Sequence, residues 1–386
     1  VLVHAAEAEG YTLTQKDQAY LESELATLDS TWRSSGSYDS LSSYLKLNYG
    51  SYMDEDTFQS LYADQVLADS YRQHYQDSLT YTDEEAETYY SEHANDLDTF
   101  GYTVFTVQAT VEEQTDEEGN TVEMTDEEKT AALETAKADA LATAQAIQSR
   151  LTNGEDAQAL ADEYADALYS SSIHTTAMGS TFSSAAYADW LYDAARQSGD
   201  ITLAELDRSE SSAYNYYVVQ FDSRTRDDSA TADVRHILIG AASSGTTPTQ
   251  EEFDAAEAEA QALLDQWKAG DATEDSFAVL AVQNTDDSGS QSTGGLYSGI
   301  SSTDSLEPNF LNWALDPARQ PGDTGIVKNE SSSIQGWHIM YFVGWDDPAW
   351  EYTVKSTWKE SDTSEWLASL TENVEAVHGS GLDLVS

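Results

Sequence analysis

The chain contains one eleven-residue pattern twice, at residues 190–200 and 313–323. Seven of the eleven positions are identical: a Trp, an Asp, an Ala-Arg-Gln run, a Gly and a final Asp. Chance is a poor explanation for this many identities, and each pattern lies between an opening and a closing strand-like segment. The sequence therefore predicts two domains of one plan, over residues 97–226 and 233–347.

In the second copy, the opening and closing segments at residues 234–239 and 336–342 have the pattern of short strands. Alternation along a strand puts His236 and His338 on otherwise apolar faces. Between the two strands the sequence predicts an amphipathic helix, a second short helix and a loop at residues 284–297. The Gly and Ser content of this loop suits a mobile wall of a substrate site.

The order of these segments and their residues resemble the parvulin family of peptidyl-prolyl cis/trans isomerases, over residues 234–344. The resemblance implies an enzyme that rotates X-Pro bonds without covalent chemistry, and it implies no cofactor and no metal. It implies that His236 and His338 hydrogen-bond to each other, and that Asp287 lies beside the substrate carbonyl with Ser288 in the same network. It also implies that substrate is bound by Leu306, Phe310 and Leu315.

Each of these residues also has a structural interpretation. A single histidine on an apolar strand face is more often a hydrogen-bonded structural residue than a catalyst, and two within the parvulin pattern reverse that preference. Asp287 alone would be an ordinary loop residue, which is how we interpret its neighbour Asp286. Leu306 and Phe310 would ordinarily belong to a core. A metal site of two histidines and an aspartate ranks below these, because neither the spacing nor a fourth ligand supports it.

The first copy lacks this chemistry. Val104 stands where the second copy has His236, Tyr217 stands where it has His338, and the Asp-Asp-Ser loop has no counterpart. An acidic, hairpin-like insertion at residues 112–120 is present instead. We therefore interpret residues 97–226 as a degenerate parvulin-like domain that is inactive and serves as a spacer or as a peptide-binding surface.

Residues 1–96 contain no proline and have apolar residues at helical spacing, so they predict a helical domain. Its aromatic side chains favour a core over a cradle for extended peptide. The Trp-rich tail at residues 349–386 predicts a helix that completes this domain. By resemblance to extracytoplasmic foldases of the PrsA and SurA kind, the helical domain would be the chaperone part. The predicted fold class is α+β: a helical chaperone-like domain and two parvulin-like domains, each a small, mainly antiparallel sheet flanked by helices.

The chain carries 71 acidic and 17 basic residues, a net charge of -54. Nucleic acid is excluded as a partner, because phosphate contacts need clustered Lys and Arg. A solvated, self-repelling surface is the favoured interpretation of this charge, and attraction of basic unfolded polypeptides is the functional alternative. The loop at residues 240–250 has no Lys or Arg, so no phosphate is expected on the substrate.

The sequence contains no cysteine and no apolar run long enough to span a membrane. It begins at Val1 with helix-like sequence, so we expect a targeting or membrane-anchoring segment to precede it. An extracytoplasmic localisation, secreted or anchored at the cell surface, follows from the family resemblance alone.

Two hypotheses of function remain. The first is a peptidyl-prolyl isomerase with chaperone activity on unfolded extracytoplasmic polypeptides that contain X-Pro bonds. The second is a holdase that binds peptides without turnover and uses the parvulin folds as scaffolds. Homodimerisation through the helical domain is compatible with either hypothesis.

Overall fold

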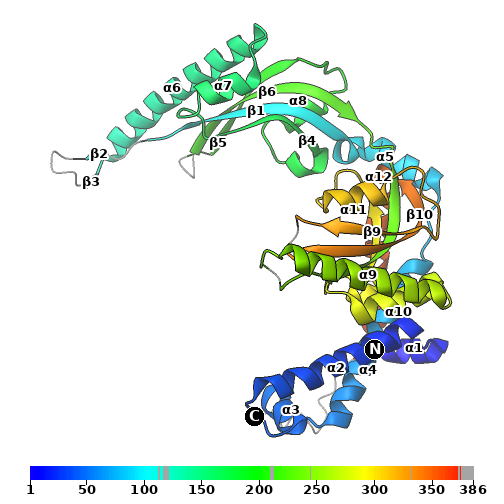
Figure 1. The fold of residues 1–386 in the computed structure, drawn as a ribbon. Helices are drawn as coiled ribbons and strands as arrows, with labels where there is room; N and C mark the ends of the chain where they lie inside the picture. The colour runs from blue at the N-terminus through cyan, green and yellow to red at the C-terminus, as the bar shows by residue number, and fades with distance from the viewer. Residues whose placement is uncertain are drawn as a thin grey trace. The chain divides into compact units, whose positions relative to one another are not determined.

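The computed structural model describes residues 1–111, 114–115, 121–208, 213–243, 245–331, 333–372 and 374. These residues form two compact units (Figure 1). The first consists of Val1–Ala86 together with the described residues from Asp228 onward, and the second of Glu87–Asp227. None of the helices in these ranges is long and apolar enough to cross a membrane.

The helical part of the first unit consists of α1 (Leu2–Glu9), α2 (Gln15–Ser35), α3 (Leu41–Tyr49), α4 (Glu55–Ser78) and, from far along the chain, α12 (Ala349–Thr371). Capping residues set where these helices begin: the Thr14 hydroxyl accepts the Asp17 N–H, and the Asp17 carboxylate accepts the Thr14 N–H. Trp366 of α12 stacks on Tyr75 of α4 with ring centroids 3.9 Å apart. Trp366 of α12 therefore packs on α4, one of the N-terminal helices.

The sheet of the first unit has the strand order β8-β7-β10-β9, with antiparallel neighbours throughout. Ile237 and Ile339 point to one face and pack with apolar residues of two helices, α9 and α10. Met340 and Phe342 point to the opposite face, which α11 covers. In chain order the elements are β7 (Ala230–Gly240), α9 (Gln250–Ala269), α10 (Glu274–Asn284), η3 (Gln291–Thr293), β8 (Leu296–Ile300), α11 (Pro308–Ala314), β9 (Thr324–Asn329) and β10 (Gly336–Pro348).

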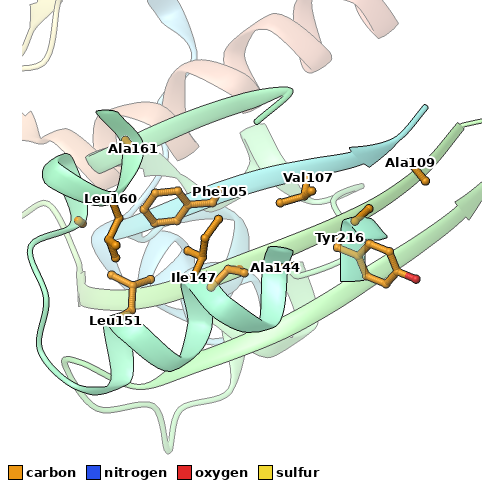
Figure 2. Close-up of a cluster of buried hydrophobic side chains, with 12 residues drawn as sticks. Phe105, Val107, Ala109, Ala144, Ile147, Leu151, Leu160, Ala161 and Tyr216 are labelled. Carbon is orange, nitrogen blue, oxygen red and sulfur yellow. The ribbon is translucent and has the colours of Figure 1, made fainter. Parts of the chain in front are cut away.

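The second unit contains a sheet of the same plan, with the order β4-β1-β6-β5. Figure 2 shows its core between β1 and α6, where Phe105 of the strand and Ile147 of the helix are both fully buried. After α5 (Asp83–Leu97), the elements are β1 (Thr99–Ala109), β2 (Gln114–Thr115), β3 (Thr121–Val122), α6 (Asp126–Thr152), α7 (Ala157–Glu163), β4 (Ser170–Met178), η1 (Gly179–Phe182), α8 (Ala188–Tyr192), β5 (Ile201–Arg208) and β6 (Ala213–Thr225).

The acidic insertion is described only in part. Its strands β2 and β3 pair in antiparallel fashion, as a hairpin requires. Residues 112–113 and 116–120 of the expected hairpin lie outside the described residues, as do residues 375–386 of the tail.

The repeated pattern has the same structure in both copies. The guanidinium of Arg196 lies 4.8 Å from the ring centroid of Trp190, and that of Arg319 lies 4.2 Å from Trp313. The first Asp of each pattern accepts the backbone N–H two residues later, and the last Asp accepts the N–H three residues earlier. These contacts shape the turn between a short helix and the next strand. The repeated residues are therefore structural, which is why a copy without the histidines can share them.

Backbone hydrogen bonds align the two copies residue by residue. The closing strand of each sheet has a Phe that exchanges two backbone hydrogen bonds with the Gly-Asp end of its own repeat, and these residues are Phe221 and Phe342. With the two aligned, the strand pairing puts Tyr217 at the position of His338 and Val104 at that of His236. The imidazole pair therefore has no counterpart in the first copy. The predicted α+β class, with two small antiparallel sheets, is confirmed.

Candidate active site

Two buried histidines on neighbouring strands form the centre of the site. His236 lies on β7 opposite Met340, and His338 lies on β10 opposite Leu238. The imidazoles are thus diagonal neighbours on one face of the sheet. Their Nδ1 atoms are 3.1 Å apart, and the two residues are 3% and 6% exposed. The structure brings together the two histidines that the sequence singled out.

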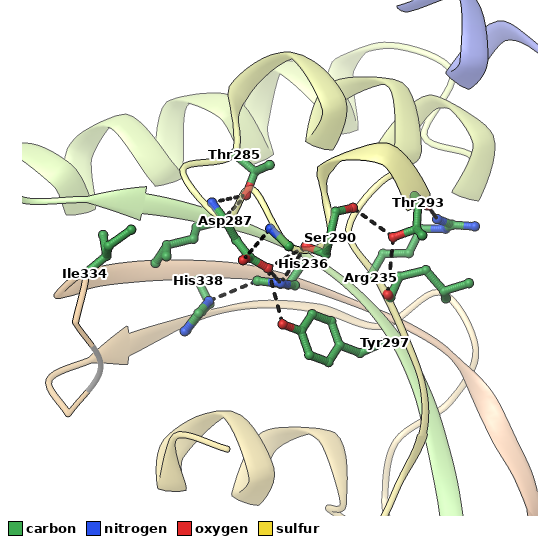
Figure 3. A network of polar contacts seen from close by, with 12 residues as sticks. Arg235, His236, Thr285, Asp287, Ser290, Thr293, Tyr297, Ile334 and His338 are labelled. Atoms are coloured by element: carbon green, nitrogen blue, oxygen red, sulfur yellow. Dashed lines mark hydrogen bonds and ion pairs between the residues drawn. The ribbon is translucent and has the colours of Figure 1, made fainter. Parts of the chain in front are cut away.

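Asp287 joins this pair through the hydrogen bonds drawn in Figure 3. Its Oδ2 atom lies 3.0 Å from His236 Nε2, and it accepts the Ser290 hydroxyl at 2.6 Å and the Tyr297 hydroxyl at 3.3 Å. Ser290 Oγ also lies 3.2 Å from His236 Nε2. One carboxylate oxygen therefore forms hydrogen bonds with a ring nitrogen and two hydroxyl groups.

The protonation of these groups at neutral pH follows from their surroundings. Hydrogen bonding to His236 holds the pKa of Asp287 well below its usual range, against the opposing effect of burial, so the carboxylate is ionised. Burial and the adjacent His236 lower the pKa of His338 to about 3, so this imidazole is neutral. Because an ionised carboxylate can only accept, His236 Nε2 carries a proton. His236 therefore donates to Asp287 through Nε2 and is joined to His338 through its other ring nitrogen.

The loop that carries Asp287 is held against the edge of β7. The Asp286 N–H donates to the Leu238 carbonyl at 2.8 Å, and the Asp286 carboxylate accepts the Gly240 N–H at 2.8 Å. The Thr285 hydroxyl accepts the Leu238 N–H and the Asp287 N–H, each at 3.1 Å. Although its side chain is exposed, Asp286 caps the strand edge, which corrects its interpretation as an ordinary loop residue.

A Gly-Gly turn ties the next part of the loop to β7. Gly295 has a φ of 74°, and its carbonyl accepts the His236 N–H at 2.8 Å. A Cβ at Gly295 would collide with the His236 carbonyl oxygen, so only glycine allows this approach. The Arg235 guanidinium donates to the Thr293 and Gly294 carbonyls at 2.7 Å and 3.1 Å. These bonds fix the turn beside the histidine pair.

A cavity of about 240 Å³ opens over the histidines. Leu306 and Phe310 line it, and the Phe310 ring centroid lies 5.4 Å from that of His236 and 5.2 Å from that of His338, with the rings nearly perpendicular. The cavity therefore has an aromatic and aliphatic wall above a polar floor. Its other lining residues are Leu238, Asp287, Tyr297, Ser305, Glu307, Asn329, Ser333 and Ile334.

Two residues that the sequence assigned to the site lie elsewhere. Ser288 is exposed, and among the described residues no hydrogen bond joins it to the cluster. Ser290 occupies that place, because the turn closed by the Gly289 N–H on Asp287 Oδ1 brings the chain back toward the carboxylate. Leu315 packs in the apolar cluster beside the cavity and does not line it.

Ser290 and Tyr297 both contact Asp287, and neither contact was predicted from the sequence. The only available signal for Ser290 was its spacing of three residues from Asp287, which is common in turns. Tyr297 carried no local signal, since its approach to Asp287 depends on the Gly-Gly turn before it.

Residues 236–344 match the family model described as "Rotamase: PPIC-type PPIASE domain". This segment is a peptidyl-prolyl isomerase domain of the PpiC type. The match confirms the parvulin resemblance, and the PpiC-type domain contains both histidines, Asp287 and the cavity.

Two solved structures of PrsA peptidylprolyl isomerases are similar to this chain. The Bacillus anthracis protein is 19% identical with a TM-score of 0.24, and the match covers 39% of this chain and 64% of that one. The Bacillus cereus protein is 13% identical with a TM-score of 0.26, and the match covers 71% of this chain and 96% of that one. The chain thus spans 64% of the length of the first of these proteins. No curated protein matches the sequence.

Proposed function

We propose that the chain catalyses peptidyl-prolyl cis/trans isomerisation at the site formed by His236, His338 and Asp287. One observation carries the proposal: a buried imidazole pair, hydrogen-bonded to an ionised carboxylate, lies at the floor of a small cavity within a PpiC-type domain. None of these groups needs to attack the substrate, because the reaction is a bond rotation and forms no covalent intermediate.

The barrier to this rotation is the loss of amide resonance, about 18–20 kcal/mol. Resonance puts partial negative charge on the carbonyl oxygen of the planar amide, and the twisted amide has less of it. A fixed anion near that oxygen therefore raises the free energy of the planar substrate more than that of the twisted state. A rate increase of about a thousandfold requires about 4 kcal/mol of such differential interaction.

Asp287 supplies this anion. Its low pKa keeps it charged at neutral pH, and His236, Ser290 and Tyr297 hold its Oδ2 atom in place. His338 is a positioning residue, since it acts on Asp287 through His236 and is itself neutral. The apolar wall of the cavity holds the proline ring and excludes water from the amide, which strengthens the effect of the charge.

The substrate needs no phosphate. Asp287 and Glu307 line the cavity, and no lysine or arginine does so among the described residues. The loop at residues 240–250 is also without basic residues. A phosphoserine before the proline would meet two carboxylates and no guanidinium, so a phosphorylated peptide is expected to turn over more slowly than its unmodified form.

An isomerisation assay on a short X-Pro peptide tests the proposal. The intact chain is expected to accelerate the reaction, and Asp287→Asn is expected to lower kcat/KM about 30-fold or more, the equivalent of about 2 kcal/mol. Asp254→Asn is the matched control, because it removes the same charge from an exposed position on α9. Full activity of Asp287→Asn would overturn the site assignment, and absence of turnover in the intact chain would overturn the activity.

A holdase role for the helical part is a second candidate. Leu47 and Tyr49 at the end of α3, Tyr52 just beyond it and Leu61 of α4 are 75%, 52%, 66% and 54% exposed. Apolar side chains of this size are accessible to an unfolded polypeptide. The double variant Leu47→Ser, Tyr52→Ser is expected to suppress client aggregation less well than the intact chain while its isomerase activity is unchanged. Undiminished suppression would argue against this surface.

We infer, from the resemblance of the sequence to extracytoplasmic foldases, that the protein acts outside the cytoplasm on unfolded or partly folded polypeptides with X-Pro bonds. A preceding N-terminal segment would anchor it to the membrane, and the helical part would mediate homodimerisation. Cell fractionation tests the localisation and the anchoring, and recovery of the protein only from the cytoplasm would refute them. Sedimentation equilibrium tests the dimer, and a monomer at all concentrations would refute it.

A further inference from the structure

We propose that the first copy binds an extended, basic segment of an unfolded polypeptide along the open edge of β1, in a groove beside α6. The inference rests on the proposed action on unfolded clients. The groove has a volume of about 800 Å³ and lies between the end of β1, the middle of α6 and the turn at residues 166–169. The groove lies on the face of its sheet that α6 covers. The isomerase cavity lies on the other face of the corresponding sheet, which α11 covers. The groove is therefore not a remnant of the isomerase site.

The strand edge that borders the groove differs between the two copies. In an antiparallel sheet, alternate residues of a strand direct their N–H and C=O groups to the same side. In β7, Leu238 and Gly240 direct these groups toward the active-site loop, where the Asp286 N–H bonds the Leu238 carbonyl and the Asp286 carboxylate bonds the Gly240 N–H. The alignment of the copies puts Thr106 and Gln108 of β1 at these two positions.

At the edge of β1 the Thr106 carbonyl has a hydrogen-bond partner, whereas the Gln108 N–H and carbonyl have none among the described residues. The Thr106 carbonyl accepts the Tyr169 N–H at 2.9 Å, which is the counterpart of the bond made by Asp286. Pairing between β4 and β1 ends at Thr106, whereas β1 continues to Ala109. Within the described part of the chain, no carboxylate caps the Gln108 N–H as Asp286 caps Gly240. Both backbone groups of Gln108 therefore face the groove, where a further strand can pair with them.

The charges around the groove select a basic occupant. Asp139 and Asp166 line it, and no lysine or arginine does so among the described residues. Lys137 of α6 is engaged elsewhere, with its Nζ atom 4.5 Å from the ring centroid of Tyr214 and 3.3 Å from a Glu134 carboxylate oxygen. The net charge of -54 adds to the negative electrostatic potential around the groove. Lysine or arginine side chains of a bound segment are attracted, and acidic segments are repelled.

Small side chains on α6 leave room for a polypeptide backbone. The groove is lined by Ala132, Ala136, Ala140 and Thr143 of this helix. The corresponding helix of the other copy, α9, presents Phe253, Leu264 and Trp267 as buried residues. A segment with small or β-branched residues facing α6 fits this space. Pairing through the backbone tolerates many sequences, as a protein that acts on varied unfolded clients requires.

Binding of a labelled, proline-free peptide of alternating valine and lysine to the full chain tests this inference by fluorescence anisotropy. The lysine peptide is expected to bind at least ten times more tightly than a counterpart with glutamate, and added salt is expected to weaken it. The double variant Asp139→Asn, Asp166→Asn is expected to raise Kd about tenfold, which corresponds to about 1.4 kcal/mol. Gln108→Pro removes the edge N–H and is expected to raise Kd similarly, whereas Gln108→Thr keeps the N–H and is expected to bind normally.

The outcomes separate this inference from the proposed activity. All of these variants are expected to isomerise an X-Pro peptide at the rate of the intact chain. Absence of peptide binding, or equal Kd values for the intact chain and the double aspartate variant, would overturn the groove while leaving the isomerase intact. Competition between the lysine peptide and the X-Pro substrate would also overturn it, because binding would then be at the PpiC-type site. Circular dichroism checks that the Gln108→Pro chain is folded. If it is unfolded, the Kd of the double aspartate variant alone tests the groove.

Discussion

His236 and His338 lie on adjacent strands with their Nδ1 atoms 3.1 Å apart, and the other ring nitrogen of His236 lies 3.0 Å from Asp287. The His236 imidazole therefore joins His338 of the neighbouring strand to the carboxylate of the active-site loop. A change in the charge of either ring would alter the position or the charge balance of the carboxylate. The stability and the activity of the domain should consequently respond to the same groups.

Acid is expected to destabilise the PpiC-type domain through His338. Burial lowers the pKa of His338 from 6.5 to about 3 in the folded chain. Between these values the unfolded state binds more protons than the native state, so the stabilisation by neutral His338 is complete above the unfolded pKa and is lost as the pH falls toward the folded one. The loss is at most about 1.4 kcal/mol per pH unit.

Urea denaturation at a series of pH values measures this slope. His338→Gln cannot titrate, so its free energy of unfolding is expected to depend less on pH in that window. His4→Gln is the control, because His4 lies on the exposed surface of α1. If the free energy of unfolding of His338→Gln depends on pH as strongly as that of the intact chain, other groups cause the acid sensitivity.

Ser290 and Ser288 provide a matched pair of hydroxyl groups in one loop. Ser290 is 3% exposed and donates to Asp287 at 2.6 Å, whereas Ser288 is exposed. Ser290→Ala removes a hydrogen bond to a charged group, and it is expected to lower kcat/KM about three- to tenfold, or about 1 kcal/mol. Ser288→Ala is expected to keep the rate of the intact chain. Equal rates for the two variants would contradict the assignment of Ser290 to the site.

Much of the site could be predicted because its signals are local in the sequence. His236 and His338 each interrupt the alternation of an apolar strand, and the repeated Trp-to-Asp pattern sets the limits of both copies. Asp287 belongs to a motif that the family resemblance covers. These features depend only on the order of neighbouring residues, and the family match over residues 236–344 confirms the resemblance.

The remainder depended on contacts between distant residues. Leu315 follows the last residue of α11, and the direction of that helix turns it into the neighbouring cluster and away from the cavity. The loop after Asp287 also contacts the N-terminal helices, since Lys16 Nζ donates to the Ser292 carbonyl at 2.9 Å. No periodicity in either segment indicates that bond, so the position of α2 beside the active-site loop could not be predicted.

Alanine substitutions at Gly295 and Gly322 distinguish the cost of backbone strain from the cost of a steric clash. Both have positive φ, at 74° and 91°, but a Cβ at Gly322 would have no atom within 4 Å, whereas one at Gly295 would collide with the His236 carbonyl. Gly322→Ala is expected to cost about 1–2 kcal/mol of unfolding free energy from the left-handed conformation alone. Gly295→Ala is expected to cost more and to abolish most isomerase activity, because the turn must move away from β7. Thermal melts and the peptide assay measure both effects, and similar behaviour of the two variants would refute the close approach.

Lys355 of α12 forms ion pairs with a cluster of three carboxylates in the first unit. Its Nζ atom lies 2.9 Å from Asp83, 2.9 Å from Asp347 and 2.7 Å from Glu351, and its side chain is 13% exposed. Burial opposes the charge of Lys355, but hydrogen bonds to these carboxylates raise its pKa well above the usual range. Burial also raises the pKa of Glu351. Lys355→Met is therefore expected to destabilise the chain by about 3 kcal/mol, because it leaves a buried carboxylate without its cation.

Two further measurements distinguish this electrostatic cause from lost packing. Adding Glu351→Gln to Lys355→Met is expected to recover part of the stability, since the buried anion is then also removed. Calcium is expected to raise the melting temperature of Lys355→Met and not that of the intact chain, because the oxygens of Asp83, Asp347 and Glu351 lie within 4.8 Å of one another and become a cation site once the ammonium is gone. If neither the glutamine nor calcium restores stability, the loss in Lys355→Met comes from the missing aliphatic contacts of the lysine side chain, and the three carboxylates do not determine how α12 is held.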